Sequence, residues 1–274
     1  MYSRKYTGKV HLVILDTAGT VCDGPQDLRH RWQEDDLLGC KAPVLPFYNV
    51  LKKHGITVDW GTIRKSMGMY KPEHLRQLLH HPDIEAQYIK KYGHSCTQTE
   101  YLCILDEFKT ELLLYAVDDD LIKPVDGAVE CIDQLREAGV FLGIDTGYFD
   151  NIARLVNAKL AENFNIHFDI STNSELVQGR PSPGMIFDCM TKAHTWPADC
   201  VVKVDDTASG ILSGNNAGCW TVGVYATGSN DYDTLRSAQP DFLIPSIRYL
   251  PEIIFCQIEP ALRRGKRPGQ AMRE

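Results

Sequence analysis

The chain has 274 residues, of which 43% are hydrophobic and 24% charged, so it is long enough for one sizeable domain with a smaller inserted one. Its formal net charge of −7, with acidic and basic residues interspersed, argues against a nucleic-acid-binding surface. No apolar run approaches the roughly 18 residues that a membrane helix needs, and the nine cysteines include no CxxC pair, so we expect a cytoplasmic protein with free thiols and no membrane or nucleic-acid partner.

The first predicted element is a strand over Val10–Leu15, because a nearly continuous apolar run is typical of a strand buried on both faces of a parallel sheet. The run ends at Asp16, which is followed by the tight-turn sequence Ala18-Gly19-Thr20. A carboxylate in such a turn can attack a phosphorus atom, although a lone Asp-x-x-Gly-Thr segment is more often a structural turn. The assignment of Asp16 as a nucleophile therefore depends on companion residues elsewhere in the chain.

Helical patterns fill the long stretch after the first strand. The spacing of apolar residues predicts one helix that begins at Pro43, another that begins at Pro72, and a longer one over about Glu100–Ala116. We interpret residues 25–121 as a linker insertion and an α-helical cap domain.

Strands separated by helical patterns return after this stretch. Three more apolar runs each lead into polar or glycine-containing turns: Val140–Ile144 into Asp145-Thr146-Gly147, Cys200–Val204 into Asp205-Asp206-Thr207, and Thr221–Tyr225 into Ala226-Thr227-Gly228. The alternation predicts an α/β core, built from residues 1–24 and 122–274, with a doubly wound, mainly parallel sheet.

The ligand crevice of such a sheet lies at the carboxyl ends of its strands, so Asp16, Thr146 and Asp206 are expected to converge there. A carboxylate that processes phosphate needs a divalent cation, a hydrogen-bonding cradle and a fixed positive charge. Asp206 could hold the cation beside Asp16, Thr146 and Gly147 could donate hydrogen bonds, and Arg180 could supply the charge. Mg²⁺ suits a site with only oxygen ligands.

A second informative segment is Met67–His74, which contains a lysine before a proline. Most lysines are solvated surface charges with a pKa of about 10.4. Pro72 suits the first helical position, which places Lys71 at the positive end of a helix, where the neutral, nucleophilic amine is favoured. His74 lies three residues on and would share the same helical face. We interpret Lys71 as an amine that could capture an aldehyde.

These motifs, in this order, resemble the haloacid dehalogenase superfamily and, within it, the phosphonoacetaldehyde hydrolase family. The likeness covers nearly the whole chain, and the arginine of the third motif and the cap lysine are unusual for the superfamily. The resembling segments are Asp16–Thr20 with Asp23-Gly24, Cys40–Pro43, Met67–Lys71 with His74, Thr146–Tyr148, Gly179–Pro181, Lys203–Thr207 and Asn216–Val224.

The resemblance implies that the chain hydrolyses the carbon–phosphorus bond of phosphonoacetaldehyde through a Schiff base on Lys71 and an aspartyl phosphate on Asp16. It also implies Mg²⁺ as cofactor and a homodimer formed through cap helices. Met67 and His74 would line the cap side of the site, with the histidine moving protons. The implied residues are Asp16, Lys71, His74 and Met67 for catalysis, Thr146, Gly147, Tyr148 and Arg180 for substrate binding, and Asp16, the Ala18 carbonyl and Asp206 for the metal.

Two departures from the family pattern concern the linker and the fourth motif. Residues Pro25–Gly39 look like an insertion between core and cap. The fourth motif of the family resembles Gly-Asp-Thr followed by another acid, whereas this chain has Asp205 before Asp206 and then Gly210. We expect Asp205 to replace the missing acid electrostatically.

Two alternative functions remain compatible with the sequence. A phosphatase of the same superfamily would act on a small phosphate ester and would use Lys71 only to bind an anion. A non-catalytic protein that senses a phosphonate metabolite would keep the fold and lose the nucleophile, and the presence of Asp16 argues against it.

Overall fold

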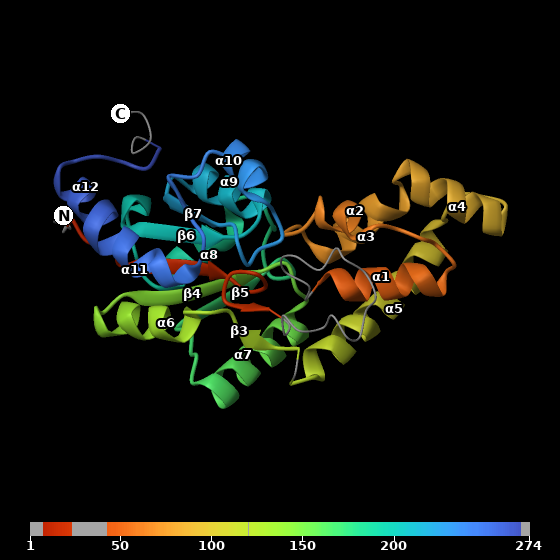
Figure 1. Cartoon of the computed structure of the whole chain (residues 1–274), viewed down its shortest axis with the longest axis horizontal. Helices are drawn as coiled ribbons and strands as arrows, with labels where there is room; N and C mark the ends of the chain where they lie inside the picture. Colours follow the sequence, from red (N-terminus) through yellow and green to blue (C-terminus); the bar gives the residue numbers. More distant parts are fainter. Residues whose placement is uncertain (1–7, 24–42, 120, 270–274) are drawn as a thin grey trace.

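A computed structural model describes residues 8–23, 43–119 and 121–269 (Figure 1). The predicted insertion Pro25–Gly39 lies outside the described residues. The strands form a six-stranded sheet with the order β5-β4-β1-β6-β7-β8, in which every neighbouring pair is parallel. This confirms the predicted doubly wound, parallel α/β sheet. The six strands are β1 (Leu12–Asp16), β4 (Phe141–Thr146), β5 (Ile170–Asn173), β6 (Val201–Asp205), β7 (Trp220–Val224) and β8 (Phe242–Ile244).

The register of the central strands brings acidic residues to one edge of the sheet. Asp16 at the end of β1 is paired with Asp145 of β4, and Leu15 is paired with Val204 of β6. Asp205 is the last residue of β6, directly after Val204, so the three acids lie at the same level on adjacent strands. The carboxyl edge therefore concentrates negative charge in a buried place.

Both faces of the sheet are covered because side chains of β1 alternate between two apolar clusters. Val13 and Leu15 pack in the larger cluster with α6 and α7, whereas Leu12 and Ile14 pack in a smaller one with α8. The helices of the core are α6 (Ala128–Glu137), α7 (Asp150–Phe164), α8 (Gly184–Lys192), α9 (Ala208–Ala217), α10 (Tyr232–Ser237), α11 (Leu250–Glu252) and α12 (Glu259–Arg263). Shorter elements are the hairpin of β2 (Cys22–Asp23) and β3 (Lys123–Pro124), the 3₁₀ helices Ala198–Cys200 and Ile247–Tyr249, and a π-helix over Ile253–Ile258.

Five helices between the first two long strands form a separate lobe, on the right in Figure 1. They are α1 (Val44–Lys53), α2 (Trp60–Arg64), α3 (Lys71–Leu79), α4 (Pro82–Tyr92) and α5 (Gln98–Val117). The three helices predicted in this stretch are present. The third begins two residues earlier than predicted because Thr97 and Glu100 form a capping box.

The interior of this helical lobe is apolar and aromatic. Phe47 of α1 stacks on Phe108 of α5 with ring centroids 4.2 Å apart, and it also contacts the ring of His74 on α3. These contacts join three helices of the lobe. Among the described residues, no helix combines the length and the apolar composition that crossing a membrane requires.

Candidate active site

Asp16 and Arg180 meet at the carboxyl edge of the sheet. Asp16 is 5% exposed, and its Oδ1 accepts a hydrogen bond from Nη2 of Arg180 at 2.6 Å. The same guanidinium bonds to the carboxylate of Asp145 and lies 3.3 Å from Oδ2 of Asp205. Asp16 and Arg180, which are 164 positions apart in the sequence, are therefore in direct contact.

Lys203 is a second buried cation at this edge, and the sequence analysis did not assign it to the site. It lies in the middle of β6, its Nζ is 2.5 Å from Oδ1 of Asp145, and it is 2.8 Å from Oδ2 of Asp205. Burial disfavours its charge, but Asp145 and Asp205 outweigh this effect and raise the pKa of Lys203. A lysine inside an otherwise apolar strand was the signal that could have identified it.

The buried cluster holds three carboxylates against two cations. Burial, only partly offset by Arg180, raises the pKa of Asp16, and Asp205 adds to this rise. Burial also opposes ionisation of Asp205, yet Arg180 and Lys203 together hold the pKa of that carboxyl below its usual range. Asp16, the nucleophile candidate, is therefore less stabilised as an anion than Asp205 in the same cluster.

Asp206 lies in the same region without a protein cation beside it. Its Oδ1 accepts a hydrogen bond from Oγ1 of Thr20 at 3.2 Å, and its Oδ2 accepts one from the amide of Ser229 at 2.7 Å. Burial, and then the charges of Asp16 and Asp205, hold its pKa well above the usual range. Within the described ranges no ion pair involves Asp206, so the ionised Asp16 and Asp206 fit a divalent cation.

A second set of carboxylates, made of three aspartates, also lies close enough together to bind a metal ion. One ligand atom from each of Asp16, Asp145 and Asp205 lies within 4.8 Å of the others. Arg180 and Lys203 already contact all three carboxylates of this group. On electrostatic grounds Asp206 is the better partner for Asp16 in holding a cation.

The turn after β4 contacts the helical lobe closely. Thr146 is buried, and its Oγ1 accepts a hydrogen bond from the amide of Tyr148 at 3.3 Å. At Gly147 a Cβ atom would lie only 2.6 Å from the carbonyl oxygen of Met69, so no larger residue fits. At Gly68, where φ is +83°, a Cβ would lie 2.4 Å from Oγ1 of Thr207. The loop before α3 is therefore pressed against the strand tips.

The loop is also hydrogen-bonded to the core. Oγ of Ser209, at the start of α9, donates to the carbonyl oxygen of Met67 at 3.2 Å. The side chain of Met67 is buried in the apolar cluster that includes the lobe. Met67 therefore contributes a backbone contact with the core and a packed side chain.

Lys71 is the first residue of α3 and is only 3% exposed. Its Nζ lies 5.6 Å from the centroid of the Tyr148 ring, directly after the Thr146–Gly147 turn. The amine of the lobe therefore faces inward toward residues of the strand tips. Pro72 occupies the second helical position, one residue later than the sequence analysis predicted.

His74 is buried beside the ring of Phe47, with ring centroids 4.2 Å apart, and is electrically neutral. Its Nε2 is 2.9 Å from the carbonyl oxygen of Ile63, which requires a proton on Nε2 and leaves Nδ1 as an acceptor. Burial, with the nearby charge of Lys71, lowers the pKa of His74 to about 3. Nδ1 is buried and has no hydrogen-bond partner among the described residues. His74 can thus accept a hydrogen bond at Nδ1, but with a pKa of about 3 it is a weak base, and at neutral pH it has no imidazolium proton to give.

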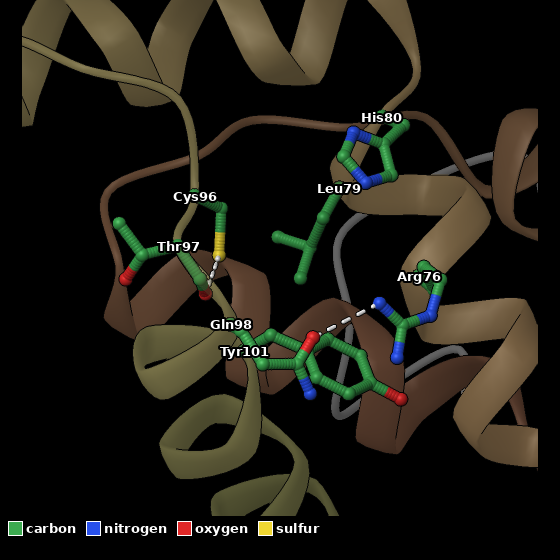
Figure 2. A pocket seen from close by; sticks show the side chains of 7 residues that line it. All are labelled: Arg76, Leu79, His80, Cys96, Thr97, Gln98 and Tyr101. Carbon is green, nitrogen blue, oxygen red and sulfur yellow. Dashed lines mark hydrogen bonds between the residues drawn. The ribbon is translucent and has the colours of Figure 1, made fainter.

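A hollow of about 20 Å³ between α3 and α5 lies away from this site and has room for one water molecule (Figure 2). The contacts around it connect the two helices. The guanidinium of Arg76 lies 4.2 Å from the Tyr101 ring and donates to Oε1 of Gln98 at 3.2 Å. The hydroxyl of Tyr101 donates to the carbonyl oxygen of Pro72 at 2.8 Å. These contacts hold the first turn of α3, which carries Lys71.

Comparisons of sequence and of structure with known proteins point to the same group of hydrolases. Residues 60–224 match the profile of haloacid dehalogenase-like hydrolases, a segment that includes Lys71, Arg180 and Asp206. A phosphonoacetaldehyde hydrolase from Bacteroides fragilis is 33% identical over 224 residues, which cover 81% of this chain and 78% of that protein. One from Bacillus cereus is 31% identical and covers 79% and 76%. The crystal structure of a phosphonoacetaldehyde hydrolase like protein from Oleispira antarctica superposes with a TM-score of 0.83 at 25% identity, covering 98% of this chain and 99% of that one.

Proposed function

Since the chain belongs to the haloacid dehalogenase-like hydrolase family, we propose that it hydrolyses the carbon–phosphorus bond of phosphonoacetaldehyde to acetaldehyde and phosphate. The observation that carries this proposal is the buried position of Lys71 beside Tyr148, which follows the end of β4, the strand paired with the strand of Asp16. The names of the relatives from Bacteroides fragilis and Bacillus cereus support the same substrate.

An amine is needed because direct displacement at phosphorus would expel a carbanion. Lys71 would condense with the aldehyde of the substrate and release one water molecule, which gives an iminium ion. When the carbon–phosphorus bond breaks, its electron pair moves into the iminium and forms an enamine. The enamine then takes a proton on carbon, and water hydrolyses the resulting iminium to acetaldehyde and free Lys71.

The steps at the phosphorus atom would be carried out by residues at the carboxyl edge of the sheet. A carboxylate oxygen of Asp16 would form the new bond to phosphorus as the bond to carbon breaks, and water would later hydrolyse the aspartyl phosphate to phosphate. Arg180 would grip the phosphonate oxygens, together with Thr146, Gly147 and Tyr148. Arg180 already touches Asp16, so a phosphoryl group bound to it would meet the nucleophile.

The lobe side of the site would be lined by Met67 and His74. Because His74 is neutral, with a pKa of about 3, and its Nδ1 has no partner among the described residues, we assign it a hydrogen bond that Nδ1 would accept during Schiff-base formation rather than the transfer of protons that the resemblance implies. Met67 would exclude water from the amine through its packed side chain.

The donor set fits Mg²⁺, which Asp16, the carbonyl of Ala18 and Asp206 would hold. The supporting observation is the raised pKa of both buried carboxyls, Asp16 and Asp206, which a divalent cation would relieve. When bound, Mg²⁺ would neutralise charge on the phosphoryl oxygens.

We propose further that the lobe acts as a cap domain over residues 25–121, and that the protein is a cytoplasmic homodimer joined through this cap. Support for an interface comes from α5, because this one helix exposes several large apolar side chains. They are Leu102, Leu113, Leu114 and Val117.

The proposal is tested by incubating the purified protein with phosphonoacetaldehyde and measuring acetaldehyde and phosphate separately. We expect the two products in equal amounts, and we expect a chelator to stop both and added Mg²⁺ to restore them. A folded protein that releases neither product would overturn the proposal. Release of phosphate from a small phosphate ester by the same preparation would then identify it as a phosphatase, in which Lys71 binds an anion.

A further inference from the structure

Phe149 is a residue of the core whose ring packs against the helical lobe. It is the N-cap residue of α7 and is only 3% exposed. Its ring packs edge to face with that of Tyr70, with ring centroids 6.4 Å apart, and with that of Phe108 on α5, also at 6.4 Å. Nζ of Lys109, on the same helix, lies 4.9 Å from the centroid of the Phe149 ring. One side chain of the core therefore contacts α5 and the residue directly before α3.

The chain connects these contacts directly to the amine and to the turn after β4. Phe149 follows Tyr148, whose ring centroid lies 5.6 Å from Nζ of Lys71. Tyr70 precedes Lys71 and is the N-cap residue of α3. Each member of the Tyr148–Lys71 pair thus has a chain neighbour in the aromatic contact. A displacement of the Phe149 ring would therefore be passed on to the amine.

A second series of ring contacts leads from Phe149 to His74. Phe108 stacks on Phe47 with centroids 4.2 Å apart, and the ring of Phe47 lies 4.2 Å from that of His74. Aromatic rings prefer edge-to-face and offset stacked arrangements, so such contacts fix orientation as well as distance. The position of the Phe149 ring therefore affects both α3 side chains of the proposed site, Lys71 and His74.

The Phe149 ring depends on these partners because the space on one side of it is open. A groove of about 220 Å³ lies between α5 and α7, and Phe149 and Ile152 are among the residues that line it. Close packing cannot hold the ring where it borders the groove. Its position is therefore set by the rings of Tyr70 and Phe108 and by the amine of Lys109, since a cation is attracted to the face of an aromatic ring.

We infer that Phe149 is a positioning residue, which places the amine of Lys71 for reaction with an aldehyde whose phosphorus atom is held at the strand tips. The inference rests on the proposed function. One carbon atom separates the aldehyde carbon from phosphorus in phosphonoacetaldehyde, so Lys71 and Asp16 must reach atoms of the same small molecule. A misplacement of about 1 Å can slow such a reaction by roughly 10²-fold. A phosphate ester forms no bond with Lys71, so its hydrolysis should not depend on Phe149.

The test compares variants on two substrates, phosphonoacetaldehyde and p-nitrophenyl phosphate. Phe149→Leu keeps an apolar side chain and removes the ring, so kcat for the phosphonate should fall by roughly 10²-fold while hydrolysis of the ester changes by less than about threefold. Tyr70→Leu removes the partner ring and should separate the two substrates in the same way. Phe149→Tyr keeps the ring and should stay within about threefold of wild type on both substrates.

Phe242→Leu is the matched control. It removes a ring of β8 that packs near Trp220 of β7, with centroids 6.3 Å apart. The melting temperature of this variant should fall, but the ratio of its two activities should stay that of wild type. A loss of stability alone therefore does not imitate the expected separation of the substrates.

Two further measurements follow the contact itself. The double variant Phe149→Leu with Tyr70→Leu should be little worse than the more affected single variant, because both substitutions break one contact. Borohydride added during turnover of phosphonoacetaldehyde should trap Lys71 more slowly in Phe149→Leu than in wild type.

A Phe149→Leu variant that loses both activities equally would have only a structural defect and would overturn the inference, as would one within about threefold of wild type on the phosphonate. Fully multiplicative losses in the double variant would also contradict it. Failure of the proposed function is seen separately: the wild type itself would then neither cleave phosphonoacetaldehyde nor form a borohydride adduct, and the inference would fall with it.

Discussion

At the strand tips, five buried charged side chains contact one another, whereas the helical lobe presents one amine and one neutral imidazole from an apolar interior. The five at the strand tips are Asp16, Asp145, Arg180, Lys203 and Asp205. The lobe places Lys71 and His74 near each other, and the charge of Lys71 helps to keep His74 neutral. Under the proposed function, the strand tips would handle a phosphoryl group whatever its leaving group, and the lobe would determine which leaving group is accepted.

The largest effect should come from the nucleophile, which both kinds of substrate need. Asp16→Asn should lower the release of phosphate from phosphonoacetaldehyde and from p-nitrophenyl phosphate by roughly 10⁴-fold or more, because the amide cannot form the aspartyl phosphate. Steady-state phosphate release with each substrate measures this. If the Asp16→Asn variant still hydrolysed the ester, the assignment of phosphoryl transfer to the strand tips would be wrong.

A substitution in the lobe should separate the two substrates. Lys71→Arg keeps the charge and cannot form a Schiff base, so cleavage of phosphonoacetaldehyde should fall by roughly 10³-fold while hydrolysis of the ester changes by less than about threefold. Lys65→Arg, at an exposed position of the same lobe, is the matched control and should resemble wild type. Near wild-type cleavage of the phosphonate by Lys71→Arg would show that the lobe supplies no covalent chemistry.

A single added methyl group at Gly147 should disturb the contact between the helical lobe and the strand tips. In Gly147→Ala the added methyl group would meet the carbonyl oxygen of Met69, and the displaced loop would carry Lys71 away from the strand tips. We expect kcat/KM for phosphonoacetaldehyde to fall by about 10²-fold. Gly143→Ala in β4, the strand that precedes Gly147, is the control, since its Cβ would make ordinary contacts at 3.4 Å or more. An unchanged Gly147→Ala enzyme would contradict the close approach of lobe and core.

The neutral state of His74 predicts a smaller effect on stability. Its folded pKa of about 3 lies below the ordinary value of 6.5, so the unfolded state binds more protons between these pH values and stability rises with pH in this window. From pH 7 to pH 5 the free energy of unfolding should fall by about 2 kcal/mol through this group. His74→Gln, which can keep the hydrogen bond to Ile63, should lack this part of the fall.

Denaturant unfolding of the wild type and His74→Gln at the two pH values measures the difference between their pH dependences. Other titrating groups contribute equally to both proteins and cancel in the comparison. The same pH dependence in both proteins would show that His74 is not held neutral.

The sequence predicted the long central strands because each is a continuous apolar run that ends at a turn with polar side chains. It did not predict β5 or β8, which have four and three residues and carry too short a pattern to separate from a loop. The apolar spacing predicts the start of α5 two residues late because the capping box of Thr97 and Glu100, which begins the helix at Gln98, is made by polar residues.

The site was predicted less completely than the fold. The type of residue at the end of a strand or in a turn predicts Asp16, Arg180 and Thr146 as site residues, and their roles stay predictions. The contacts of Lys203 with Asp145 and Asp205 join three positions across two strands, and only the register of the sheet brings them together. The exclusion of a side chain at Gly210 likewise depends on tertiary structure, since Asp205 fills the space from another element.

The central claim is that the amine of the lobe bonds to the substrate above the carboxylate of the core. Reduction with borohydride during turnover of phosphonoacetaldehyde tests it most directly, with the modified peptide located by mass spectrometry. We predict irreversible loss of activity that depends on the substrate and a reduced carbon chain on Nζ of Lys71, absent when borohydride is added alone. A protein that releases phosphate from phosphonoacetaldehyde under these conditions and carries no adduct at Lys71 would contradict the account.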